Sequence, residues 1–252
     1  MSIAIVGMLM VAGQAHAQGR GGPPPTAKAA APFDVTGYWV AVVTEDWHYR
    51  MVTPRVGDYL GIPMTLESKK VADAWDPAKD EAAGEQCKSY GAAGIMRIPA
   101  RLRIAWQDDN TLKMEIDAGT QTRVFHFGDW KSPGGEATWQ GDSVAHWEGR
   151  RTGLDGRGLG DPRGQPQAGG LEVATTHLKA GYLRKNGVPY GANAAMTEYY
   201  DVVRERSGDL WLVLTSVVRD PLYLSEPYIV STHYKQEAGA AGWDPTACSA
   251  RW

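Results

Sequence analysis

The segment Leu210-Trp-Leu-Val-Leu-Thr-Ser-Val-Val218 decides the fold class of this chain. It is aliphatic, aromatic or hydroxylic throughout, and it lies between the turn sequences Ser207-Gly208-Asp209 and Asp220-Pro221. β-Branched and aromatic residues bounded by turn residues are typical of a β-strand. Three further segments of this kind lie nearby, at 171–177, 196–203 and 228–234. The last third of the chain therefore predicts an antiparallel meander that closes a barrel or a sandwich.

The same alternation occurs earlier in the chain. Leu102, Ile104 and Trp106 occupy every second position before a turn at Asp108-Asp109-Asn110, and the alternation resumes from Leu112. This pattern predicts a hairpin with one buried face. Further strands are expected at residues 37–43, 120–127 and 136–148.

Two stretches interrupt the predicted strands. Residues 66–90 predict a short helical insertion, with Thr65 as an N-cap and Asp76-Pro77 ending one helix and starting the next. Residues 150–170 are rich in glycine and have almost no apolar content, which predicts a flexible loop, more an insertion than a functional gate.

The beginning of the chain predicts export. Residues 1–17 contain no Asp, Glu, Lys or Arg, have an apolar core and end in Ala15-His16-Ala17, which is typical of a signal peptide. The Gly- and Pro-rich residues 18–32 predict a linker, and residues 33–252 a single β-barrel domain. The expected localisation is periplasmic or secreted, with no membrane insertion after cleavage of the signal.

Net charge indicates which partners are excluded, and the cysteine content indicates which cross-link to expect. The formal net charge of −3, with interspersed signs, argues against nucleic acid. Only two cysteines occur, Cys87 and Cys248, and an oxidising compartment favours a disulfide between them. Two free thiols and metal ligation are the alternatives, although no C-x-x-C spacing supports a metal. Phosphate-loop and dinucleotide motifs are absent, so no cofactor is predicted, and the oligomeric state stays unknown.

A series of short motifs occurs in a fixed order between residues 85 and 248: Cys87, Ile98-Pro99, Arg123-x-Phe125, Trp139 to Glu148, Thr197-Glu198, Asp220-Pro221, Pro227-Tyr228 and Cys248. The series resembles a large, mostly uncharacterised group of secreted bacterial proteins that look like lipocalin-type β-barrels. The resemblance implies a mainly β fold, an antiparallel lipocalin-like (calycin-type) barrel with a short helical insertion, and export. It implies no established reaction.

Histidines are the first candidates for chemistry, because imidazole titrates near neutrality. Four of the five that follow the predicted signal peptide fall on expected strands, so a barrel could bring them into one cavity. His177 and His233 are favoured, since each shares its strand face with a hydroxyl two positions earlier, on Thr175 and Ser231. No tight ligand spacing occurs, so no metal is predicted, and acid/base and purely structural roles both stay open. The five histidines are His48, His126, His146, His177 and His233.

Glu198 joins the candidate catalytic residues because it lies in an otherwise apolar strand. A glycosidase would need a second carboxylate facing a sugar. We favour an ion pair between Glu198 and Arg123 inside the barrel, because buried carboxylates are usually paired. The catalytic candidates are therefore His177, His233, His126, His146 and Glu198.

Aromatic residues suggest a ligand cavity. The chain has 10 Trp and 11 Tyr but only 3 Phe, a bias that suits a ring-bearing ligand as well as aromatic packing of the barrel. The basic segment Gly181–Tyr190 could close over an anionic or phenolic ligand, although a solvated hairpin tip is favoured. The leading hypothesis is a barrel that binds a small aromatic or amphipathic molecule in its cavity, and the alternative is a lyase, isomerase or hydrolase that uses cavity histidines. Candidate ligand contacts are Trp47, His48, Trp106, Arg123, Trp139, Tyr182 and Tyr190.

Overall fold

The computed structural model describes residues 24–148 and 169–251. The predicted signal peptide and nearly all of the predicted 150–170 loop lie outside the described residues. The described part of the predicted linker packs against the barrel, because the backbone NH groups of Ala27 and Lys28 donate to the side-chain oxygen of Asn110 and to the carbonyl oxygen of Asp109, in the turn between two strands.

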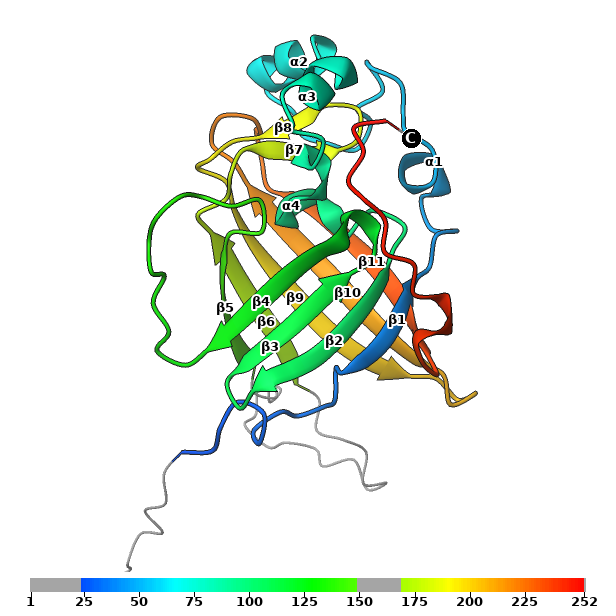
Figure 1. Cartoon of the computed structure of the whole chain (residues 1–252), viewed down its shortest axis with the longest axis vertical. Helices are drawn as coiled ribbons and strands as arrows, with labels where there is room; N and C mark the ends of the chain where they lie inside the picture. The colour runs from blue at the N-terminus through cyan, green and yellow to red at the C-terminus, as the bar shows by residue number, and fades with distance from the viewer. Residues whose placement is uncertain (1–23, 149–168, 252) are drawn as a thin grey trace, which may run out of the picture.

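Nine strands form a closed barrel in the ring order β1-β11-β10-β9-β6-β5-β4-β3-β2 (Figure 1). A separate hairpin pairs β7 with β8. The bounds are β1 (Gly37–Ala41), β2 (Arg101–Asp108), β3 (Thr111–Ile116), β4 (Gln121–Phe127), β5 (Asp142–Glu148), β6 (Gly170–Thr176), β7 (Gly181–Arg184), β8 (Val188–Tyr190), β9 (Ala195–Arg204), β10 (Leu210–Arg219) and β11 (Tyr228–Glu237).

The ring is mixed rather than purely antiparallel. Eight of its strand pairs are antiparallel, whereas β4 and β5 run parallel, with Phe125 opposite Ser143. The reason is parity, because an odd number of strands cannot alternate direction around a closed ring. Residues 128–141 carry the chain back to the starting end of β4 before β5 begins. The prediction of a mainly β barrel is confirmed, and the expectation of a fully antiparallel one is corrected at this pair.

The inside of the barrel is packed with side chains. Inward positions alternate along each strand as the two-residue period requires, and together they form one continuous core. The indole of Trp39 contributes to it and donates to the carbonyl oxygen of Val35 at 3.0 Å. The largest members of this core, each at most 1% exposed, are Trp39, Leu102, Ile104, Phe125, Tyr200 and Tyr234.

Helices gather at one end of the barrel, together with the β7–β8 hairpin (Figure 1). We call this the helical end. Helix α2 begins after Thr65, whose hydroxyl accepts from the NH of Ser68, and α3 begins after Asp76, whose carboxylate accepts from the NH of Ala78. The helices are α1 (Trp47–Arg50), α2 (Leu66–Asp73), α3 (Pro77–Ala82) and α4 (Ala92–Ile95), with 3-10 turns η1 (Lys88–Tyr90), η2 (Ala118–Thr120) and η3 (Ala240–Gly242).

A disulfide ties the C-terminal segment to the helical end. Cys87, just before η1, is bonded to Cys248, as the sequence predicts. Thr246 holds the same segment against η2, because its NH donates to the carbonyl oxygen of Asp117 and its own carbonyl accepts from Thr120. The bond is compatible with an exported protein. Among the described helices, none combines the length and apolar character needed to cross a membrane.

Candidate functional site

Arg123 and Glu198 form an ion pair inside the barrel, as the sequence analysis favoured. The guanidinium is bidentate, with Nη1 2.8 Å from Oε1 and Nη2 2.5 Å from Oε2, and both side chains are fully buried. The hydroxyl of Tyr200 donates to Oε1 of Glu198 at 3.0 Å. Burial alone would lower the pKa of Arg123, but the facing carboxylate raises it above the ordinary arginine value. The pair is enclosed by the packed core, so neither residue is placed to meet a ligand.

The histidines on strands lie on the outer face of the barrel, so the expectation that they meet in a cavity is wrong. His126 alternates with the buried Arg123, Phe125 and Phe127, and its ring stacks on Trp130 with centroids 4.1 Å apart. The physical reason is the two-residue period of a strand: the inward positions are occupied by the larger apolar and paired residues.

The other two outward histidines each face a carboxylate. His146 is exposed and lies 3.4 Å from Glu172. His233 lies between the buried Thr232 and Tyr234, and its Nδ1 is 2.6 Å from Glu45. His233 does share its face with Ser231, as predicted, but that face is the outer one.

His177 follows the end of β6 rather than lying within it. Its φ of 57° breaks the alternation, so its ring does not point inward with Thr175. Nδ1 lies 2.9 Å from Oδ2 of Asp142, which also accepts from the hydroxyl of Ser132. Burial alone would raise the pKa of Asp142, but these two hydrogen bonds bring it below the usual value. Because the carboxylate stands between hydroxyl and imidazole, the imidazole cannot activate the serine, and no nucleophilic triad forms.

The predicted ligand contacts are not brought together. Trp106 packs on Phe127 near the end opposite the helices, whereas Trp139 lies beneath the ammonium of Lys179. Tyr182 donates to Asp80, and Tyr190 is buried in the small core beneath the hairpin. In α1, Trp47 is exposed and His48 bonds to Asp58. Among the described residues, no group of three His, Cys, Asp or Glu side chains is close enough to hold a metal ion.

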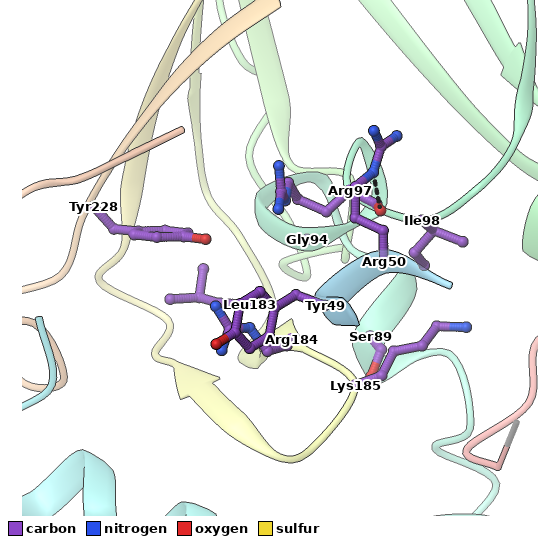
Figure 2. Close-up of a pocket in the computed structure, with 10 residues that line it drawn as sticks. All are labelled: Tyr49, Arg50, Ser89, Gly94, Arg97, Ile98, Leu183, Arg184, Lys185 and Tyr228. Carbon is purple, nitrogen blue, oxygen red and sulfur yellow. Dashed lines mark hydrogen bonds between the residues drawn. The ribbon is translucent and has the colours of Figure 1, made fainter. Parts of the chain in front are cut away.

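A small pocket does lie at the helical end, between α1, α4, the β7–β8 hairpin and the start of β11 (Figure 2). Its volume is about 20 Å³. A cavity needs roughly 10–15 Å³ to hold one water molecule, so this one accepts a single small chemical group. Its polar lining side chains are Tyr49, Arg50, Ser89, Arg97, Arg184, Lys185 and Tyr228.

The pocket lining is strongly basic. Four of its side chains are cationic residues and none is acidic. Arg97 is partly neutralised, because Nη2 lies 2.9 Å from Asp46. The guanidinium of Arg184 lies over the ring of Tyr49, 4.4 Å from its centroid. Figure 2 shows the hydroxyl of Tyr228 directed toward the other lining residues.

Two guanidinium nitrogens at this pocket lack hydrogen-bond partners. Arg50 is only 4% exposed, and it donates through Nε to the carbonyl of Arg97 and through Nη1 to that of Val42. Its Nη2, like Nη1 of Arg184, is buried with no partner among the described residues. Burial lowers the pKa of Arg50, and the nearby charge of Arg97 lowers it further. Each unsatisfied buried donor costs about 1–3 kcal/mol, which an anion accepting from it would recover.

Lys185 completes the basic lining. Its ammonium nitrogen lies 3.3 Å from the hydroxyl of Tyr90 and above the ring of that residue. Burial lowers the pKa of Lys185 to about 6. The positive charge of the pocket at neutral pH therefore comes mainly from the three arginines.

Sequence reasoning missed this group of residues, apart from one signal. The segment Gly181–Tyr190 suggested an anionic ligand, yet a solvated hairpin tip was favoured. That interpretation is wrong, because Asn186 to Tyr190 are buried against the helical end. No sequence pattern links Arg50, Arg97 and Arg184, since only the fold brings their three segments together.

Fold and pocket thus define a β-barrel protein with an arginine-lined pocket at one end. Comparison with protein-family models, with curated proteins and with solved structures found no match.

Proposed function

We propose that this protein is an exported, lipocalin-like barrel that binds a small anionic molecule. A carboxylate, sulfonate or phosphate group of the ligand occupies the pocket at the helical end. The proposal keeps the expectation of a binding protein for a small molecule and moves the site from the barrel interior to its end. The observation that carries it is the pair of buried, unpartnered nitrogens on Arg50 and Arg184 beside a cavity without a lining carboxylate.

The chemistry of arginine supports an anionic group rather than a neutral one. A guanidinium presents its donors in a fixed fork that matches carboxylate and phosphate oxygens. Tyr49 and Tyr228 supply hydroxyls and ring faces beside these donors. A cationic ligand would meet like charge on three sides, which is unfavourable in a partly buried site.

An enzymatic role has less support. The histidines that the catalytic hypothesis required lie outside this pocket, and His177, His233 and His146 each face a carboxylate of their own. The pocket lining contains no imidazole and no carboxylate. This lining supports the proposal of binding over one of turnover.

The test is a calorimetric titration of the full chain at pH 8 with benzoate, phenyl phosphate and benzylamine. We expect saturable binding of the two anions and none of the cation. Arg97→Gln and Arg184→Gln should each weaken anion binding by roughly 10- to 150-fold, the value of a charge-assisted hydrogen bond of about 1.5–3 kcal/mol.

Two control variants accompany these titrations. Arg103→Gln removes an arginine on the barrel wall that pairs with Glu115, and it should leave affinity unchanged. His177→Ala should also bind normally, whereas the enzymatic hypothesis requires a defect. Equal affinity for benzylamine and benzoate, or an undiminished affinity in Arg184→Gln, would refute the proposal.

A further inference from the structure

Exposed apolar side chains are concentrated in one stretch of the chain beside the pocket. The described residues include nine large apolar side chains that are exposed, and five of them fall between residues 47 and 60. We call residues 47–60 the apolar stretch. Its exposed members are Trp47, Met51, Val52, Val56 and Leu60, with exposures of 58%, 55%, 50%, 45% and 74%.

The apolar stretch is physically joined to the pocket at both of its ends. Near its start, Tyr49 and Arg50 line the pocket, and the next residue in the chain, Met51, is exposed to solvent. The ring of His48 connects Trp47 to Tyr49 through two edge-to-face contacts, with centroids 5.7 and 4.9 Å apart. At its end, the carbonyl oxygen of Leu60 accepts from Nη2 of Arg184 at 3.1 Å. The arginines of the pocket therefore border exposed apolar surface.

The cavity is too small to hold a whole organic ligand, so the surface beside it matters for binding. About 20 Å³ accommodates one small charged group and not the body of an organic ligand. The remainder of a ligand whose anionic group sits among the arginines must lie outside, and exposed apolar side chains occur there next to the lining residues, at Met51 after Arg50 and at Leu60, which is bonded to Arg184. Concentrated exposed apolar surface of this kind commonly marks a binding site.

We infer that the ligand of the pocket is an amphipathic anion with an alkyl chain. Its charged head accepts hydrogen bonds from Arg50, Arg97 and Arg184, and its chain lies along the apolar stretch. Arg55, which is exposed within that stretch, adds a positive charge to it. This inference rests on the proposed function and extends it from any small anion to a fatty-acid-like one.

The test is a titration of the full chain with butanoate, hexanoate, octanoate and decanoate, each kept below its micellar concentration. Burial of a methylene group is expected to tighten binding by roughly two- to fourfold, the upper figure holding for complete burial. Octanoate should therefore bind at least tenfold more tightly than butanoate. Binding to vesicles of phosphatidylglycerol is measured in parallel, to separate a single amphiphile from a bilayer surface.

A matched pair of variants locates the chain of the ligand. Val56→Ser combined with Leu60→Ser should flatten the dependence on chain length, so that octanoate affinity falls to within about twofold of butanoate affinity. The control is Val203→Ser, which removes a side chain of similar exposure (48%) beside the β9–β10 turn. Val203→Ser should leave the affinities of all four carboxylates unchanged.

The outcomes are distinguishable. If all four carboxylates bind with one affinity, the anion pocket stands and the amphiphile inference is overturned. If none binds, both are overturned. A chain-length dependence that persists in the Val56→Ser, Leu60→Ser variant places the chain elsewhere and also overturns the inference, as does tight vesicle binding without binding of the free carboxylates.

Discussion

The buried guanidinium of Arg123, in the middle of the barrel, and that of Arg50, at the helical end, differ in what faces them. Arg123 meets the carboxylate of Glu198 through two hydrogen bonds, and only its Nε lacks a partner among the described residues. Arg50 is anchored by two backbone carbonyls, and among the described residues no carboxylate forms an ion pair with it, although Glu45 and Asp46 act on its charge from farther away. Both side chains are almost completely removed from solvent.

This difference indicates which kind of buried arginine marks a binding site. A buried arginine that is paired inside a packed core has its charge compensated, so it contributes to the structure. A buried arginine that lines a pocket without an acidic lining residue, and that keeps an unpartnered nitrogen, leaves part of that compensation to a ligand. Burial of charge alone does not identify a site; the combination of burial, missing partner and open space does.

The largest loss of stability is predicted for a variant that breaks the buried ion pair. Glu198→Gln removes the negative charge and leaves Arg123 buried and uncompensated, so the free energy of unfolding should fall by about 3–5 kcal/mol. Urea denaturation measures this loss. The matched control is Glu115→Gln, which breaks a partly exposed pair with Arg103 and should cost less than about 1 kcal/mol. Similar losses in the two variants would contradict the contrast between a buried and an exposed pair.

A somewhat smaller loss of stability is predicted when the disulfide at the helical end is removed. Replacing Cys87 and Cys248 by serine removes a cross-link between residues 161 positions apart, and should lower the free energy of unfolding by about 2–4 kcal/mol. Because Cys87 adjoins η1, amide exchange should accelerate in η1 and α4 before it does in β9 and β10. Parent protein treated with a reductant should behave like the double variant. Uniform acceleration over the barrel would show that the disulfide does not act locally.

The smallest predicted effect is a dependence of anion binding on pH, which tests the charge of the pocket. Lys185, with a pKa of about 6, is mostly neutral at pH 8 and takes up a proton as the pH falls to 5. The added positive charge should strengthen anion binding by about 1 kcal/mol, roughly fivefold. Propanesulfonate is the probe, since its own charge does not change over this range. Lys185→Met should bind it with little dependence on pH, and a dependence that survives in that variant would assign the effect to another group.

Local sequence patterns were sufficient for much of the fold. The period-two alternation in Leu102, Ile104 and Leu112 predicts the β2–β3 hairpin, because a half-buried strand imposes that period on its side chains. The ion pair of Arg123 and Glu198 was predictable from the cost of an isolated buried charge. The parallel pair was not, because it follows from the total number of strands in the ring.

Local sequence patterns were enough to predict that this chain forms strands and where two of its helices begin, and they favoured the disulfide that the structure contains. These properties depend on neighbours in the chain or on having a single possible partner. Only the tertiary structure decided which strand face turns inward, and it turned the histidines outward. It also decided that Arg50, Arg97 and Arg184, which belong to three separate segments, surround one cavity. Contacts between distant segments arise from ring closure and packing, so no local pattern of residues encodes them.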